Sequence, residues 1–134
     1  MFDISTLAVK DTFVLELENS DGERLVDEAG NPRSITVYGL GSKQYQEAQA
    51  KRNLALLEFM KKGNKKGNSY EQRKLDAEFL ATCTASFNNF AYKDFTGYEM
   101  FKAAYLDASI GFISDQVNKA IGDWANFTKE SDKA

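Results

Sequence analysis

The sequence contains no histidine, and it has only one cysteine and one proline among its 134 residues. Without histidine the chain lacks the commonest general base, the commonest metal ligand and every nucleophile pair that depends on an imidazole. Cys83 is the single cysteine, so an intrachain disulfide cannot form and a reducing cytoplasm is the expected setting. No run of eighteen apolar residues occurs, so the sequence predicts no membrane span.

The composition is that of one folded domain. Hydrophobic residues make up 43% of the chain and aromatic residues 13%, which is enough to form a core and argues against wholesale disorder. The net charge of −3 lacks the basic footprint of a dedicated nucleic-acid binder. We therefore expect a single domain over residues 1–134, with neither nucleic acid nor a membrane among its partners.

Residues 1–40 are predicted to be rich in β-structure. Two stretches, 13–17 and 34–38, alternate apolar and polar side chains, and the second is also β-branched. Turn-forming residues separate them at 19–22 and 27–32. The short segment Arg24-Leu25-Val26 between the turns can start a return strand. The pattern predicts an N-terminal β-hairpin or a three-stranded meander.

Residues 41–129 are predicted to hold about four helices, followed by a flexible polar tail at 130–134. Ser42 is a suitable N-cap for the first helix, which is expected to run to about Lys62. The apolar positions of that helix are Tyr45, Ala48, Leu54, Leu57 and Met60. Together with the β-rich start, these helices predict an α+β fold.

Three further helices are indicated by capping residues and apolar spacing. Ser69 with Gln72 forms a capping-box pair for the second helix, and Thr96 with Glu99 forms one for the third. The second helix is expected to carry an apolar stripe at Leu75, Phe79, Cys83 and Phe87. The last helix has the clearest helical spacing, with apolar residues at Ile113, Val117, Ala120, Ile121, Trp124 and Phe127.

Each catalytic or metal-binding pattern in the sequence is incomplete. Cys83 lies on an apolar stripe without a base or cation beside it, so it is predicted to pack as a small hydrophobe. Residues 39–43 (Gly-Leu-Gly-Ser-Lys) match neither the Walker A motif nor the dinucleotide fingerprint and are interpreted as a strand-to-helix turn. Acidic residues in the two turns lack the spacing of a calcium loop: Asp21, Glu23, Asp27 and Glu28. We predict a non-enzymatic protein without catalytic residues, metal or cofactor.

Two further groups of residues have a simpler interpretation than a site. Three aspartates recur every eight residues, at Asp107, Asp115 and Asp123, and the last two are expected near the wet face of the final helix rather than as paired acids. Aromatic residues are dense between 87 and 105, and we expect most to be core and some to lie at an oligomer interface. These aromatic residues are Phe87, Phe90, Tyr92, Phe95, Tyr98, Phe101 and Tyr105.

A lysine-rich segment lies between the first two predicted helices. The four lysines are Lys61, Lys62, Lys65 and Lys66, and glycine and asparagine separate them. The segment lacks the interleaved aromatic residues on which nucleic-acid bases stack. A solvated loop is the simplest interpretation, and contact with a partner through these lysines is the alternative.

Three segments of the chain resemble the tail assembly chaperones of long-tailed bacteriophages and prophages. The first is Phe2-Asp3-Ile4-Ser5-Thr6-Leu7 followed by Asp11-Thr12, and the second is residues 35–45, from Ile35-Thr36-Val37-Tyr38-Gly39 to Ser42-Lys43-Gln44-Tyr45. The third runs from Phe112 to Asp123 and closes on Asn126-Phe127. The resemblance covers most of the chain, with residues 46–90 similar mainly in pattern.

The resemblance implies a role in assembly rather than in catalysis. Such chaperones act in the host bacterial cytoplasm, bind the long helical tape measure protein, and help tail tube protein to polymerise around it. They usually leave before the virion is complete, and some are also made as a longer frameshifted product. The family has no agreed catalytic residues to carry over. The resemblance also leads us to expect a homo-oligomer.

Two other functions remain open from the sequence. The chain could be a structural tail component, such as a tube, terminator or completion protein, which stays in the virion. It could instead be a small phage regulator that acts on nucleic acid or on a host protein. Presence in purified virions distinguishes the first alternative, and salt-sensitive nucleic-acid binding distinguishes the second.

Overall fold

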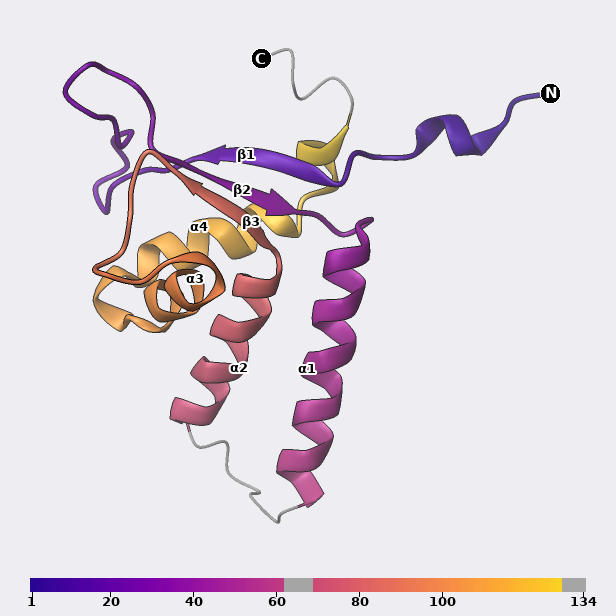
Figure 1. Cartoon of the computed structure of the whole chain (residues 1–134). Coiled ribbons are helices and arrows are strands. Elements are labelled where there is room, and N and C mark those ends of the chain that lie inside the picture. The colour runs from indigo at the N-terminus through magenta and orange to yellow at the C-terminus, as the bar shows by residue number, and fades with distance from the viewer. Residues whose placement is uncertain (62–68, 129–134) are drawn as a thin grey trace.

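The computed structural model describes residues 1–61 and 69–128, and it confirms the α+β class (Figure 1). A three-stranded antiparallel sheet combines with four α-helices and three short 3₁₀ helices. In chain order the elements are η1 (Ile4–Leu7), β1 (Thr12–Glu16), β2 (Ser34–Tyr38), α1 (Lys43–Lys61), α2 (Ser69–Thr82), β3 (Thr84–Asn88), α3 (Gly97–Leu106), η2 (Ala108–Ile110), α4 (Gly111–Ile121) and η3 (Trp124–Phe127).

The strand order is β1-β2-β3, so β2 is the central strand of the sheet. Side chains alternate between the two faces of a strand, and Ile35 and Val37 of β2 are therefore fully buried against the helices. On the opposite face the Asn88 side chain donates to Ser34 Oγ and Thr36 Oγ1 at 3.1 and 3.0 Å. This amide links β3 to β2 on the face that the helices do not cover.

The third strand is not formed by residues 24–26, as the predicted three-stranded meander would require. Around Arg24 and Val26 the structure has only two isolated bridges, Glu18 with Arg24 and Val26 with Pro32. The strand β3 instead follows α2 and lies within residues 41–129, the part predicted to be helical. The sheet is thus completed by a segment about fifty residues beyond β2.

The prediction of a single helical stripe from Leu75 to Phe87 is wrong in its second half. Helix α2 ends at Thr82, and Phe87 lies on β3. The hydroxyl of Thr82 donates to the carbonyl of Glu78 and that of Thr84 donates to the carbonyl of Leu80. These bonds occupy acceptors of the last helical turn, and β-branched threonines favour the extended chain that follows.

The main core lies between the sheet and the helices α2, α3 and α4 (Figure 1). Val117 of α4 and Phe127 of η3 are both fully buried. The Phe127 ring packs against Gly39 so closely that a Cβ there would lie 2.5 Å from the ring. Position 39 therefore requires glycine, because any larger residue would displace the ring.

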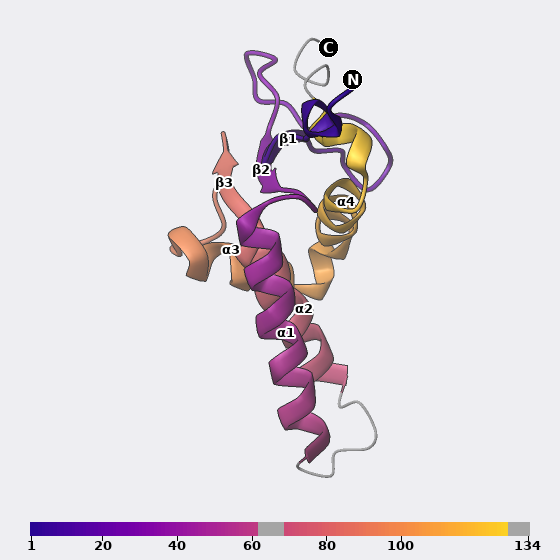
Figure 2. The same cartoon turned by 90° about the vertical axis from the view of Figure 1, so that its right-hand side faces the viewer.

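Helices α1 and α2 form an antiparallel helical hairpin that extends away from the sheet, as two perpendicular views show (Figure 1 and Figure 2). At the other end of the molecule the first residues of the chain form an arm that projects past the sheet (Figure 1). Every residue from Met1 to Ala8 is exposed, and η1 contains no buried residue. The N-terminal arm and the distal half of the helical hairpin thus lie largely outside the packed body.

Among residues 1–61 and 69–128, none of the helices has the length and apolar character needed to cross a membrane.

Candidate partner-binding surface

The distal half of α1 carries apolar side chains that the fold leaves uncovered. Although this helix has 19 residues, Ala48 is its only buried one. Leu54, Leu57 and Met60 are 65%, 54% and 70% exposed. We call these three residues the α1 stripe. Three large apolar side chains together on a surface helix mark an interaction surface more often than three scattered ones do.

Most of the α1 stripe faces away from α2. At 100° per residue, Leu54 and Leu57 lie about 120–180° around α1 from Tyr45 and Arg52, and Met60 lies about 60–80° from them. Tyr45 and Arg52 make the contacts that hold the helical hairpin together. The Tyr45 ring packs edge-on against Phe79 of α2 at 5.5 Å, and Arg52 lies 5.3 Å over the same ring.

An ion pair fixes the helical hairpin at mid-length. Arg52 Nη2 lies 2.5 Å from Asp76 Oδ1, and both side chains are partly exposed. Exposed pairs of this kind usually contribute less than about 1 kcal/mol. The Arg52–Asp76 pair acts mainly by orienting α1. It keeps the Arg52 guanidinium over Phe79, so the opposite face of α1 is turned to solvent.

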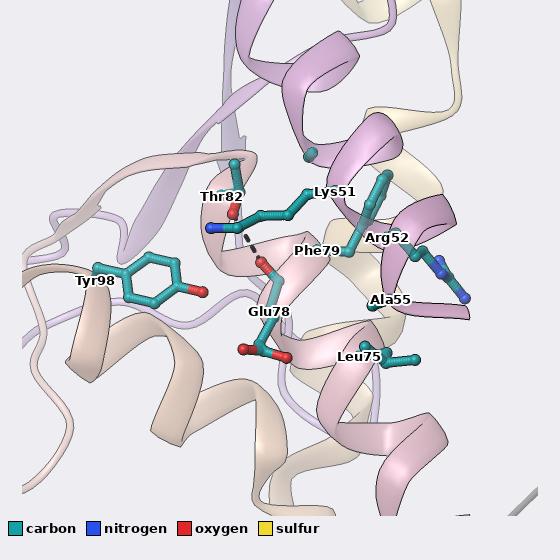
Figure 3. A pocket seen from close by; sticks show the side chains of 9 residues that line it. Lys51, Arg52, Ala55, Leu75, Glu78, Phe79, Thr82 and Tyr98 are labelled. Atoms are coloured by element: carbon teal, nitrogen blue, oxygen red, sulfur yellow. Dashed lines mark hydrogen bonds between the residues drawn. The ribbon is translucent and has the colours of Figure 1, made fainter. Parts of the chain in front are cut away.

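A shallow groove of about 150 Å³ lies between α1 and α2 on the side that α3 approaches (Figure 3). Its floor is apolar and includes Ala48, Ala55 and Phe79. Its rim is polar: Lys51 extends across the mouth and the Tyr98 hydroxyl points in from α3 (Figure 3). An apolar floor with a polar rim is the usual anatomy of a protein contact.

The Tyr98 hydroxyl at the rim of the groove is neutral at physiological pH, as an ordinary phenol is. Burial, and after it the nearby Glu78 carboxylate, raise the pKa of this phenol further, and a side-chain hydrogen bond with Thr82 partly opposes them.

The structure describes only one of the four lysines predicted to contact a partner. Lys61 is the last residue of α1, exposed and directly after Met60 of the α1 stripe. Lys62, Lys65 and Lys66 lie outside the described residues. Contact through this lysine segment remains a prediction.

The thiol of Cys83 is fully buried in the core, as predicted. Burial raises its pKa to about 12. A thiol with so high a pKa is protonated at physiological pH, and the thiolate is the form that reacts. Beside it the hydroxyls of Thr84 and Tyr105 are 2.6 Å apart and buried.

The glycine turn before α1 is an ordinary strand-to-helix connection, as predicted. The Ser42 hydroxyl is buried, donates to the carbonyl of Gly39 at 2.7 Å and accepts the N–H of Tyr45 at 3.1 Å. These bonds cap the helix and use the hydroxyl internally.

Asp27 of the second N-terminal turn is held by hydrogen bonds within its own turn and to Asn89. The Asp27 carboxylate accepts from the Asn89 side chain at 3.0 Å and from the N–H groups of Ala29 and Asn31 at 2.9 Å each. These bonds, led by that of Asn89, lower the pKa of Asp27. Over residues 1–61 and 69–128 no three acidic or cysteine side chains converge as metal ligands do.

The three aspartates spaced eight apart do not share a helical face. Asp107 accepts the N–H of Ser109 at the start of η2, and Asp123 accepts the N–H of Ala125 at the start of η3. The prediction that Asp115 and Asp123 lie on one face of the last helix is wrong, because α4 ends at Ile121 before Asp123. Two of the three carboxylates are helix caps.

Most of the predicted aromatic cluster is core. Phe87 is its centre, with ring centroids 4.6 Å from Phe90, 4.7 Å from Phe101 and 5.9 Å from Tyr105. Phe95 and Tyr98 are exposed, and Tyr98 borders the groove between α1 and α2.

Sequence reasoning identified the members of the α1 stripe as apolar helical positions but did not separate them from the core. The signal was present in the pattern. Tyr45 and Ala48 lie on one side of the helical wheel, and Leu54 and Leu57 lie on the other. A helix that buries one face needs apolar residues on one side only, so the second set indicates an exposed apolar face.

Comparison of the chain with models of protein families, with curated proteins and with solved structures finds no match.

Proposed function

We propose that this chain is a non-enzymatic tail assembly chaperone of a long-tailed phage or prophage, which binds the tape measure protein through the α1 stripe and assists tail tube assembly. The observation that carries the proposal is the exposure of Leu54, Leu57 and Met60 on the projecting helical hairpin. The resemblance of the three sequence segments to such chaperones gives the partner its identity.

A long helical partner suits this surface. Amphipathic helices bind through apolar side chains three and four residues apart that pack into an apolar surface. The spacing of the α1 stripe is complementary to such a face. The groove between α1 and α2 lies on the other side of α1 and is therefore a separate apolar surface.

The expected affinity of one contact is low. Fully burying a large apolar side chain contributes about 1.5–3 kcal/mol. The exposed fractions of the three stripe residues thus provide roughly 3–6 kcal/mol before the cost of association. After that cost such a contact is weaker than millimolar by itself and becomes strong only when several copies bind one long partner. Weak repeated contacts allow release once the tube has formed, in the host bacterial cytoplasm, before the virion is complete.

The test is co-expression with the tape measure protein encoded beside the gene. Wild type is expected to keep that protein in the soluble fraction and to co-purify with it. The double variant Leu54→Gln/Leu57→Gln is expected to lose both effects. The matched control is Lys43→Gln/Glu47→Gln, which changes two exposed residues at the other end of α1 without altering net charge.

The same preparations separate the alternative functions. If purified virions contain stoichiometric copies of the chain, it is a structural tail component and not a chaperone. If the chain binds DNA or RNA in a salt-sensitive way, it is a regulator instead. That binding should be lost when four lysines are neutralised: Lys61, Lys62, Lys65 and Lys66.

A further inference from the structure

The strand β1 has an open edge. Backbone bonds of Asp11 and Leu17, just outside its two ends, are made on the β2 side of the sheet. The direction of bonding alternates along an antiparallel strand. The backbone N–H and C=O groups that point away from β2 therefore belong to Thr12, Val14 and Glu16.

Each end of this open edge is closed by a specific bond. Before it, the N–H of Lys10 donates to the carbonyl of Phe127 at 2.7 Å. After it, the Gln116 side chain accepts the N–H of Glu18 at 2.7 Å and donates to the carbonyl of Glu18 at 2.8 Å. The Gln116 amide thus takes the place of a neighbouring strand at one residue. Between these closures the described part of the chain supplies no partner for the edge.

A cleft of about 320 Å³ follows the same edge, between β1 and α4. Phe13, Leu15 and Ala120 contribute apolar surface to it, and Lys119 and Asp123 of the α4 end contribute charge. The cleft can accept the side chains of an added strand that point to the helical side of the sheet.

The middle of the edge has little protection against pairing. Exposed edges are commonly blocked by lysine, proline, a bulge or a covering helix, and here α4 and η3 close only the two ends of a five-residue strand. The outward-pointing positions of β1 are threonine, valine and glutamate, and the glutamate is paired with Arg24. The opposite edge strand, β3, has a register irregularity against β2, which is one of these protections.

The N-terminal arm has the length and pattern of an added strand. Phe2 and Ile4 are 69% and 74% exposed and occupy alternate positions, as one face of a strand requires. The open edge spans five residues, about 17 Å, and the segment Phe2–Leu7 can cover it when extended. The 3₁₀ turn in the arm is closed by two backbone bonds and by two side-chain bonds with Asp3, all of them exposed, so extension gives up no buried contact.

The arm cannot reach the edge of its own chain without breaking existing bonds. It would have to reverse direction at residues 8–11. There the N–H of Lys10 is bonded to Phe127 and the carbonyl of Asp11 accepts the N–H of Gly39. Within residues 1–61 and 69–128 each copy has one such arm and one such open edge, so the arm of every copy can pair with the edge of another.

We propose that the arm of one copy, Phe2–Leu7, adds to β1 of a second copy as a fourth strand, with Phe2 and Ile4 in the cleft beside α4. The contact is head-to-tail, so repetition closes a ring or extends a filament. One arm buries less area than a standard protein interface, so a single contact is weak and assembly depends on concentration. This inference holds whether or not the partner of the α1 stripe is a tape measure protein.

The first test is the mass of the native full chain by light scattering over a range of concentrations. Wild type is expected to form oligomers as concentration rises, and Phe2→Asp/Ile4→Asp is expected to remain monomeric. The matched control, Leu54→Asp/Leu57→Asp, places two charges on the α1 stripe and is expected to assemble as wild type does. A monomeric wild type, or an arm variant that assembles normally, would overturn the proposal.

Disulfide trapping tests the register directly, since the native Cys83 is buried. The variant Ile4→Cys/Lys119→Cys is expected to give a ladder of oligomers under oxidation, and Ile4→Cys/Leu54→Cys is not. A ladder only in the second variant would place the arm on the α1 stripe and refute the proposal. Tape measure binding by Phe2→Asp/Ile4→Asp reports separately on the proposed function, because the arm variant leaves the stripe intact.

Discussion

Substitution of the α1 stripe is expected to leave the stability of the fold nearly unchanged. Fully burying a leucine side chain contributes about 1.5–3 kcal/mol. Leu54 and Leu57 retain only about a third and a half of that burial, so Leu54→Gln and Leu57→Gln should each lower the free energy of unfolding by roughly 0.5–1.5 kcal/mol. A core substitution provides the contrast: Phe127 is fully buried, and Phe127→Ala should cost about 3–5 kcal/mol.

Urea denaturation followed by circular dichroism measures these differences. The midpoint should move little for the two leucine variants, and the slope of the transition should be unchanged, because the surface exposed on unfolding is nearly the same. A loss of more than about 2 kcal/mol in either leucine variant would show that these side chains are core. The exposed stripe, and with it the proposed partner surface, would then be refuted.

Three further predictions concern the core. Gly39→Ala should destabilise the fold by about 1–3 kcal/mol in urea denaturation, because the new Cβ would lie 2.5 Å from the Phe127 ring; an unchanged midpoint would contradict this. Tyr105→Phe should cost about 1–2 kcal/mol, because it removes the buried hydrogen bond to Thr84, and a neutral effect would refute it. Burial raises the pKa of Cys83 to about 12 from 9.0 and also raises that of Tyr105. Stability from the neutral thiol is complete below pH 9 and falls as the pH rises toward 12, so Cys83→Ala should flatten the decline in unfolding free energy over that range.

The hairpin of β1 with β2 and the helical second half were predictable because their patterns are local. Alternation at residues 13–17 and 34–38 and the serine cap before α1 each follow from neighbouring residues. The segment Thr84–Asn88 was missed because its pairing partner, β2, is distant in sequence. In the helical spacing, Cys83 and Phe87 continued the stripe of Leu75 and Phe79, and the pairing of Thr84–Asn88 with β2 cannot be seen in that spacing.

The candidate surface was predictable in composition but not in location. Leu54 and Leu57 have the same spacing as core residues, and their burial depends on which side of α1 packs against α2. One end of the open edge of β1 is set by Gln116, whose side chain bonds the backbone of Glu18, 98 residues away in the sequence. A single sequence carries no pattern for such a contact.

The most direct test of the proposed function is methyl resonance spectroscopy of the chain mixed with helical fragments of the tape measure protein. We expect the methyl signals of Leu54, Leu57 and Met60 to shift or broaden on addition of a binding fragment, while those of buried Val117 and Ile121 stay in place. Binding that perturbs other methyl groups and leaves these three unchanged, or no binding to any fragment, would contradict the assignment of the α1 stripe as the partner surface.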